Sequence, residues 1–473
     1  MYFKLKPQYA LRGWNGASWI LIKRPFNEKF YLSHEEFNAL ILCDGVTDIT
    51  EDMCSIDLKE YFIIDDENIL EECAEPSPIE DDQYYKYHDN RFVQSVFWSM
   101  TGKCNYKCKH CFMDAPEGVF GELNTEEALK LIDDMNECGI LTLDITGGEP
   151  LVRRDFWTLI DRVVSYKINI NQIYTNGWLV NEKFLLGLKE RGLHPEICIS
   201  FDGVGWHDWM RGVKGAEEAA YRAFELCRKH GFRAGAQMCI FKGNAHLIPE
   251  TVEKLASLGV MSLKTGDVAD TDLWCKNCED NKMEFSEYLD AMLDYIPKFF
   301  EQGRPMNVTL SSVIGLPSFK SNEDILYIMD RTRGCQNPEK CKLCHEARYT
   351  CYIGPNGRLL PCMPITSAPD SVQEKFPFVQ EIGLKKALTG SFYMDFIDRS
   401  IEDLHKVNKK CANCKYKYIC GGGCRASAVI NGKDDLMGCD EKLCYEYHHG
   451  YYEKINEITK AAVKKYAPEL EAK

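Results

Sequence analysis

The sequence predicts an α/β protein built around a partial (β/α)6 barrel, with a small α+β module before it and a cysteine-rich domain after it. Three observations predict this class. Six strand-like runs alternate with helical stretches between residue 92 and about residue 270, which implies a parallel sheet like three quarters of a (β/α)8 barrel. A capped helix with short β-like runs precedes this region, and eleven cysteines lie between Cys335 and Cys444. The length of 473 residues also favours two or three units over a single domain.

The N-terminal module is expected to span residues 1–75 and to be winged-helix-like. Short β-like runs at residues 2–5 and 19–23 precede a helix that begins at Ser33. Ser33 and Glu36 have the spacing of a capping box, and Asp44-Gly45 is expected to end the helix. Residues 76–91 contain two prolines and a run of acidic residues, so they are predicted to be a linker.

The barrel itself is expected to span residues 92–275. Its strands are predicted at residues 93–98, 141–146, 169–174, 196–201, 234–241 and 260–264, and its helices begin near Thr125, Asp155, Asn181, Glu217 and Pro249. In such a fold the catalytic groups gather at the C-terminal ends of the strands. A helical bridge is predicted over residues 276–334, the cysteine-rich domain over residues 335–450 and a C-terminal helix over residues 451–473.

The composition limits the kinds of partner that the protein is expected to bind. The net charge of −15 and the pI near 5.3 argue against nucleic acid, because neutralising phosphates requires clustered Lys and Arg. No stretch approaches the roughly 20 apolar residues of a membrane span, and residues 1–20 lack the apolar core of a signal peptide, so a cytoplasmic location is expected. In a large chain without such a signal, the 23 cysteines are expected to bind metal rather than to form disulfides.

Three cysteines follow the first predicted barrel strand directly, as Cys104-x3-Cys108-x2-Cys111. Three thiolates at this spacing can hold three irons of a four-iron cluster and leave the fourth iron free to bind and reduce a ligand. A zinc loop is the alternative, although structural zinc sites usually have a fourth ligand at paired spacing. The spacing therefore favours an iron–sulfur cluster with an open iron.

The second predicted strand ends in Thr146-Gly147-Gly148-Glu149-Pro150. Two glycines allow the backbone to come close to a ligand, and the Glu149 carboxylate could accept hydrogen bonds from an ammonium group. An ordinary tight turn is the alternative. The position of this motif one βα unit after the cysteine triplet favours a ligand site.

The triplet, Gly-Gly-Glu-Pro and the six β/α alternations together resemble the radical S-adenosylmethionine (SAM) superfamily. The resemblance implies that the open iron chelates the amino and carboxylate groups of SAM. One electron then cleaves SAM to methionine and a 5′-deoxyadenosyl radical, which takes a hydrogen atom from the substrate. It also implies contacts with the ribose or the carboxylate of SAM at four later positions: Asn176, Ser200, Asp202 and Arg211.

The C-terminal pattern is Cys344-x12-Gly357-x4-Cys362, then Cys411-x2-Cys414-x5-Cys420-x3-Cys424, then Cys439 and Cys444. It resembles the SPASM domain, which carries two auxiliary [4Fe–4S] clusters in radical SAM peptide-modifying enzymes. The resemblance assigns one cluster to Cys411, Cys414, Cys420 and Cys444, with Cys439 as the alternative late ligand, and the other to Cys344, Cys362 and Cys424. The fourth ligand of the latter is left open between Cys335, Cys341, Cys351 and a substrate thiolate. A zinc ribbon is disfavoured because the ligands exceed two zinc sites. Cys275 and Cys278 are either a redox pair or two idle thiols.

The N-terminal module resembles the recognition element of enzymes that modify ribosomally made peptides (RiPPs), which holds a leader peptide as an added strand; a structural cap is the alternative. The predicted function is therefore maturation of a ribosomal precursor peptide, leader plus core, through a thioether or another intramolecular crosslink. An electron donor such as flavodoxin or ferredoxin is expected, and no catalytic base is assigned. Three alternatives are an anaerobic sulfatase maturase, a small-molecule SAM enzyme and a non-catalytic metal-binding interaction protein. The first is disfavoured because Met363, not Asp, follows Cys362.

Overall fold

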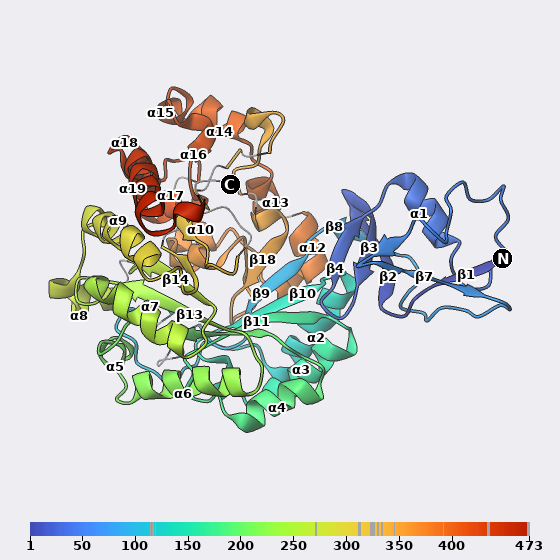
Figure 1. Ribbon diagram of the computed structural model, residues 1–473, viewed down its shortest axis with the longest axis horizontal. Coiled ribbons are helices and arrows are strands. Elements are labelled where there is room, and N and C mark those ends of the chain that lie inside the picture. Colours follow the sequence, from blue (N-terminus) through green and yellow to red (C-terminus); the bar gives the residue numbers. More distant parts are fainter. Residues whose placement is uncertain are drawn as a thin grey trace.

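The computed structural model has three parts around one large sheet (Figure 1). The N-terminal module, blue in the figure, projects from one side of the barrel, and the C-terminal region, orange to red, lies above the barrel in this view. The structure describes the chain apart from residues 114, 116–117, 119, 270–271, 311–313, 322–326, 329–330, 333, 345, 391, 433–435 and 471–473. Among the described residues, no helix combines the length and the apolar character that crossing a bilayer requires.

The barrel confirms the predicted fold class. Six parallel strands pair in chain order: β9 (Ser95–Ser99), β10 (Thr142–Thr146), β11 (Asn169–Thr175), β12 (Glu196–Ser200), β13 (Ala234–Ile240) and β14 (Ser262–Asp267). The helices that connect them are α2 (Thr125–Glu137), α3 (Phe156–Ser165), α4 (Glu182–Glu190), α5 (His207–Arg211), α6 (Ala216–Lys229) and α7 (Ile248–Ser257). Each strand alternates a side chain buried under these helices, such as Val96 and Trp98, with one that faces the barrel interior, such as Phe97.

The predicted helical bridge is only partly helical, and this prediction is corrected. α8 (Asp272–Asn277) and α9 (Phe285–Glu301) are helices, but β15 (Asn307–Thr309) then adds a further parallel strand beside β14. β16 (Ile314–Leu316) and β17 (Tyr327–Ile328) continue the sheet in antiparallel pairing. Strands of two or three residues are too short to show a period-two pattern, so the sequence did not predict them.

The other edge of the sheet joins the barrel to the C-terminal region. β18 (Thr350–Ile353) pairs in parallel with β9, and β19 (Leu359–Leu360) completes a hairpin with it. The result is one sheet of eleven strands among the described residues. This hairpin lies between Cys344 and Cys362 in the sequence, so the sheet itself sets the position of Cys362 relative to the barrel.

The N-terminal module contains a four-stranded sheet in the order β4 (Glu28–Tyr31), β3 (Ala17–Lys23), β2 (Tyr9–Asn15) and β8 (Lys86–Arg91). Two smaller pairs accompany it: β1 (Tyr2–Leu5) with β7 (Leu70–Cys73), and β5 (Ile63–Ile64) with β6 (Glu67–Asn68). The predicted helix is α1 (His34–Ile41), and the capping box of Ser33 and Glu36 is confirmed. A second, separate core of this module lies between α1 and the strands.

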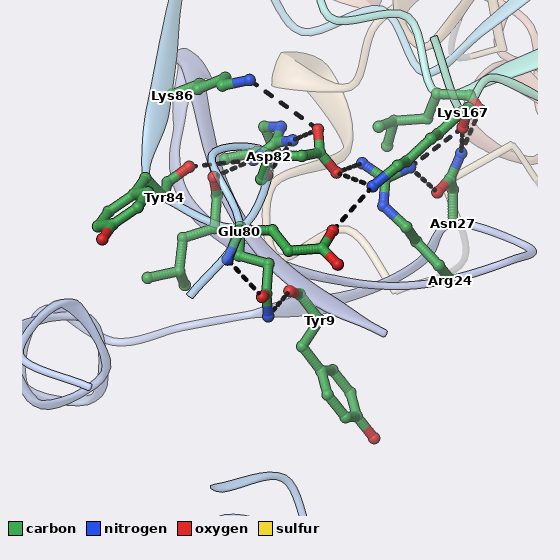
Figure 2. Close-up of polar contacts among 12 residues, drawn as sticks. Tyr9, Arg24, Asn27, Glu80, Asp82, Tyr84, Lys86 and Lys167 are labelled. Carbon is green, nitrogen blue, oxygen red and sulfur yellow. Dashed lines mark hydrogen bonds and ion pairs between the residues drawn. The ribbon is translucent and has the colours of Figure 1, made fainter. Parts of the chain in front are cut away.

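The predicted linker at residues 76–91 is corrected, because it is built into the module. β8 pairs in parallel with β2, and Asp82 accepts ion pairs from Arg12, Arg24 and Lys167 at 2.8, 2.7 and 3.1 Å (Figure 2). Arg12 is almost fully buried, so the carboxylate is required to compensate its charge. The acidic run that suggested a solvated linker is therefore partly a set of ion-pair partners.

The same contacts fix the module to the barrel. Lys167 lies two residues before the start of β11, and Asn27 donates hydrogen bonds to the carbonyl oxygens of Leu141 and Lys167 at 2.7 and 2.9 Å. Trp14 Nε1 donates to the carbonyl of Cys138 at 3.0 Å. These carbonyls all lie before β10 or β11. The module is thus attached at the N-terminal ends of the barrel strands, opposite the end where catalytic groups are expected.

The C-terminal region is mostly helical beyond the hairpin. Its helices are α10 (Asp370–Gln373), α11 (Val379–Ile382), α12 (Leu384–Thr389), α13 (Phe392–Ile397), α14 (Ile401–Val407), α15 (Lys409–Ala412), α16 (Lys417–Cys420), α17 (Arg425–Gly432), α18 (Glu441–His448) and α19 (Tyr451–Tyr466). α19 packs on α9, and a short turn of 3-10 helix at Pro468–Leu470 follows it.

Candidate active site

A cavity of ≈ 480 Å³ opens at the C-terminal ends of the barrel strands. Two parts of the chain line it. The barrel contributes Cys104, Cys108, His110, Cys111, Gly147, Gly148, Asn176, Ser200 and Arg211, and the C-terminal region contributes Thr350, Cys351, Tyr352, Pro361, Cys362, Met363 and Pro364. The cysteine triplet and a cysteine of the SPASM-like pattern therefore face one enclosed space.

Each sulfur of the triplet receives an N–H group. The backbone N–H of Tyr106 donates to Cys104 Sγ at 3.4 Å, that of Ala115 donates to Cys111 Sγ at 3.4 Å, and Arg211 Nη1 donates to Cys108 Sγ at 3.8 Å. Such donors stabilise thiolates and tune iron–sulfur clusters. Burial raises the pKa of Cys104 to about 12, so in the absence of metal this thiol keeps its proton, which a bound metal would displace. Three soft ligands with N–H donors on one cavity wall fit an iron–sulfur cluster.

Gly147 and Gly148 allow two segments of backbone to come into close contact. Gly148 N–H donates to the carbonyl of Thr101, and Glu149 N–H donates to the carbonyl of Lys103, both at 2.8 Å. A Cβ at Gly148 would lie 2.2 Å from the Lys103 oxygen, and one at Gly147, where φ is +155°, would lie 2.7 Å from the Thr101 oxygen. The glycines thus bind the Gly-Gly-Glu-Pro turn to the triplet loop, in addition to lining the cavity.

Glu149 differs from the expectation. Its carboxylate is fully buried and accepts hydrogen bonds from Thr175 Oγ1 at 2.9 Å, Asn176 N–H at 2.7 Å and Leu151 N–H at 3.1 Å. Burial raises the pKa of Glu149 to about 7. It is not among the described residues that line the cavity. The side chain connects the ends of β10 and β11 rather than offering itself to an ammonium group. The neighbouring Pro150 is also buried, and it begins a short 3-10 helix.

Asp202 and Arg211 form one buried unit. Arg211 Nε donates to Asp202 Oδ2 at 2.6 Å and Nη2 donates to Oδ1 at 3.2 Å, while His207 Nδ1 lies 3.4 Å from Oδ2. Burial alone would raise the pKa of Asp202, but the Arg211 guanidinium and His207 hold it well below its usual value. Only Arg211 of this unit lines the cavity, so the predicted direct contact of Asp202 is replaced by a positioning role behind Arg211.

Asn176 and Ser200 both line the cavity, and their contact with SAM stays a prediction. Asn176 Nδ2 donates to Asn105 Oδ1 at 2.7 Å and lies 3.9 Å from Cys104 Sγ, so this side chain contacts the triplet loop. Ser200 is the last residue of β12 and faces the same space. Their positions on successive strand ends place both within the cavity.

The sequence analysis missed the polar residues deeper in the barrel. Asp144, Tyr174, Gln237 and Lys264, from β10, β11, β13 and β14, line the inner end of the cavity. Asp144 accepts a hydrogen bond from Ser95 Oγ at 3.0 Å, and burial raises its pKa to about 6. The signal that the sequence offered for them was a polar residue at alternate positions of strands that are otherwise buried. His110 of the triplet loop was also missed; burial lowers its pKa to about 4, so its ring is neutral.

The inner auxiliary set comprises Cys344, Cys362 and Cys424. Their thiols are near enough to affect one another: burial and the neighbouring Cys424 together raise the pKa of Cys344 to about 11. Burial also raises the pKa of the Cys362 thiol, and the neighbouring Cys424 and Cys344 both add to the rise. Two of the three alternatives for a fourth ligand, Cys335 and Cys341, form a disulfide that the sequence did not predict. The third, Cys351, is buried and lines the same cavity as Cys362.

The outer auxiliary set is richer in ligands than expected. Cys411 Sγ lies 3.5 Å from Cys439 Sγ, and Cys414 Sγ lies 3.5 Å from His448 Nε2. Cys444 also belongs to this group. Burial raises its pKa most, and the neighbouring Cys439 and Cys414 raise it as well. Cys420 likewise has Cys444 as a neighbour. The structure therefore brings both late cysteines to this set, together with a histidine that the sequence analysis missed.

Cys275 and Cys278 are not arranged alike. Cys275 is exposed, whereas Cys278 is buried against an aromatic cluster that includes Trp274 and Phe241. Cys278 packs as a small apolar side chain, which explains its burial without a redox role.

Comparisons with known proteins agree with the geometry of this site. A profile of the Radical SAM superfamily matches residues 98–260. Fe-coproporphyrin III synthase of Methanosarcina barkeri is 27% identical over 377 residues, 76% of this chain and 90% of that protein. PqqA peptide cyclase of Granulibacter bethesdensis is 25% identical over 341 residues, 71% and 84% respectively.

Among solved structures, Streptococcus suis SuiB bound to S-adenosylmethionine superposes with a TM-score of 0.63 at 16% identity, covering 93% of this chain and 99% of SuiB. SuiB bound to its precursor peptide SuiA gives a TM-score of 0.62 at 16% identity, with the same coverage. Radical SAM enzymes use SAM and a [4Fe–4S] cluster, and the cysteine triplet in the loop after β9 fits that cluster. Residues 98–260 are therefore a radical SAM domain, and the chain is an enzyme of the radical SAM superfamily.

Proposed function

We propose that this enzyme modifies a ribosomally made precursor peptide and forms a thioether or another intramolecular crosslink. The observation that carries the proposal is the shared cavity. The SAM-binding triplet and Cys362 of the inner auxiliary set line the same ≈ 480 Å³ space, so a substrate held there meets both. Among the relatives, the names of PqqA peptide cyclase and of SuiB bound to precursor peptide SuiA support a peptide substrate.

In this proposal Cys104, Cys108 and Cys111 hold the SAM-binding cluster. SAM, when bound, supplies the carbon radical that takes a hydrogen atom from the substrate. Arg211 stabilises the thiolate of Cys108 at the cavity wall, because Asp202 holds the guanidinium through Nε and Nη2 and directs Nη1 to the sulfur. Ser200 and Asn176 offer polar contacts from neighbouring strand ends.

The C-terminal region is proposed to be a SPASM domain with two auxiliary [4Fe–4S] clusters. Cys344, Cys362 and Cys424 hold the inner one and leave a position for a substrate thiolate, since thiolates are favoured cluster ligands. Cys411, Cys414, Cys420 and Cys444 hold the outer one, with Cys439 as the alternative. The cytoplasmic location and the electron donor, such as flavodoxin or ferredoxin, stay predictions of the sequence.

A second candidate is modification of a porphyrin, because Fe-coproporphyrin III synthase and two AdoMet-dependent heme synthases are 26–27% identical to this chain. Those alignments cover 74–76% of the chain, and the alignment with PqqA peptide cyclase covers 71%, so sequence coverage does not separate the two candidates. The N-terminal sheet favours the peptide, because the exposed edge of its β4 strand offers a place where a peptide strand could pair. The formylglycine-forming alternative stays disfavoured by Met363.

The test uses anaerobically reconstituted enzyme, SAM, a reductant and any short Cys-containing peptide that an open reading frame beside the gene encodes. Mass spectrometry is expected to show deoxyadenosine and a peptide lighter by two hydrogens. A Cys→Ser peptide is the matched control for thioether formation. The triple variant Cys104→Ala, Cys108→Ala, Cys111→Ala is expected to lose about four irons and both products. SAM-dependent conversion of a porphyrin precursor to Fe-coproporphyrin III or to heme, without any change in the peptide, would establish the second candidate instead.

A further inference from the structure

A second cavity lies where the N-terminal sheet meets the C-terminal region. This cavity of ≈ 440 Å³, here the seam cavity, is lined by Asn15, Gly16, Ala17, Tyr31, Arg91, Phe92, Arg348, Tyr349, Met394 and Asp398. Asn15 ends β2, Ala17 begins β3, Tyr31 ends β4 and Arg91 ends β8. One whole end of the four-stranded sheet therefore opens into the seam cavity, and the C-terminal region forms its opposite wall.

The seam cavity carries an excess of positive charge. Arg91 and Arg348 both bind the same oxygen, Asp398 Oδ1, at 3.1 and 3.2 Å. The two guanidinium groups are largely enclosed, with side-chain exposures of 14% and 26%. Burial lowers the pKa of Arg348, and the neighbouring Arg91 lowers it further, as expected for two cations that share one carboxylate. One further negative charge would complete the pairing.

The donors for such a charge are present. Each guanidinium has five N–H groups. Among the described contacts, Arg348 donates only to Asp398, and Arg91 donates only to Asp398 and to Met394 Sδ at 4.0 Å. Most of these N–H groups are therefore available at the cavity wall. A carboxylate fits them best, because guanidinium and carboxylate groups match in planar, two-point geometry.

The position of β4 indicates what brings the carboxylate. β4 is the last strand of its sheet, and among the described residues it pairs only with β3, so its outer edge is free to accept a strand. Tyr31, at the end of β4, is 63% exposed and lines the seam cavity. β8, which ends at Arg91, is the opposite edge strand of the same sheet. A peptide paired along β4 would therefore continue past Tyr31 and across the end of the sheet to reach Arg91 and Arg348 in the seam cavity.

We propose that the seam cavity binds the carboxylate of an acidic residue in a peptide strand that pairs with β4. The proposal rests on the proposed function for its peptide, and it adds a specificity determinant: an Asp or Glu at the end of the pairing segment. The site selects the peptide by charge, at a place remote from the triplet cavity.

The first experiment uses glutarate as the probe and full-length enzyme, by thermal unfolding at constant ionic strength. Glutarate is expected to raise the midpoint, and neutral glutaramide is not. Arg348→Gln should abolish the effect, while Arg154→Gln, an exposed arginine outside the cavity, should preserve it. Asp398→Asn removes the competing carboxylate and should enlarge the glutarate effect, even if it lowers the midpoint of the free protein. No glutarate effect on the wild type, or equal effects in wild type and Arg348→Gln, would overturn the proposal.

The second experiment tests the strand. The peptide acetyl-Val-Thr-Val-Thr-Glu-amide, with its acidic residue at the end of the pairing segment, should bind more tightly than glutarate. Its Gln counterpart should bind about tenfold more weakly or worse, the value of one charge-assisted pair. Equal affinity for glutarate and the peptide would make the seam cavity a site for small carboxylates and refute the pairing with β4. No arm requires SAM cleavage, so failure here leaves the radical chemistry standing.

Discussion

Asp202→Asn is expected to destabilise the barrel strongly, because it leaves the Arg211 cation buried without its partner. Asp202 has no solvent exposure, and the side chain of Arg211 is only 10% exposed. Two charge-assisted hydrogen bonds, at 2.6 and 3.2 Å, are weakened at once. Breaking a buried ion pair by removing one partner costs about 3–5 kcal/mol. The free energy of unfolding should fall by about that amount at neutral pH.

The assay is urea denaturation followed by tryptophan fluorescence, since Trp206 and Trp209 lie on or beside the helix that carries Arg211. Arg211→Gln should cost less, because the buried Asp202 carboxylate can then take up a proton. In the double variant the two losses should overlap by about 2–3 kcal/mol, the coupling of neighbouring charges. Strictly additive losses would refute the pairing, and with it the positioning role of Asp202.

Three further predictions concern pH, the attachment of the module and its deletion. Because the folded pKa of Asp144 is raised from 3.8 to about 6, its protonated form favours folding, and the wild type should lose about 2 kcal/mol of stability between pH 4 and 7 that Asp144→Asn retains. Equal pH profiles would contradict this. Asp82→Asn should increase hydrogen exchange in the N-terminal sheet, because it weakens the ion pairs of this carboxylate, while SAM cleavage stays unchanged. Asp81→Asn, at the exposed neighbouring residue, should not increase exchange. Equal protection in the two variants would argue against the ion-pair role of Asp82. Removing residues 1–91 should weaken peptide binding while leaving substrate-free SAM cleavage, and unchanged affinity would make the module a mere cap.

Local patterns predicted the barrel well, since every predicted strand overlaps an observed one and the capping box at Ser33 is present. They failed where pairing is remote. Thr350-Cys-Tyr-Ile353 is a short buried run like many others, and nothing within it indicates that it pairs with β9. The linker failed for a related reason: Asp82 looks solvated until Arg12 and Arg24 reach it from the other end of the module.

The site shows the same division. The triplet is set by spacing within eight residues, so its position at the cavity followed from the sequence. The orientation of Glu149 depends on Thr175 and Asn176, which another strand supplies, and no local rule reveals it. Asp144 was hidden because one polar residue in a short apolar strand usually marks the solvent side of a sheet, whereas here it marks the barrel interior.

The pairing of β18 with β9 has a consequence for how the protein is made. β9 is an early strand of the barrel, yet one of its edges stays uncovered until a segment about 250 residues later leaves the ribosome. At usual synthesis rates of about 5–20 residues per second, that edge waits on the order of 10–50 seconds. An open strand edge invites pairing with other chains. Nascent chains that stall before residue 350 should therefore be the ones that aggregate or engage chaperones, and the isolated segment 92–275 should be insoluble even though it contains all six barrel strands.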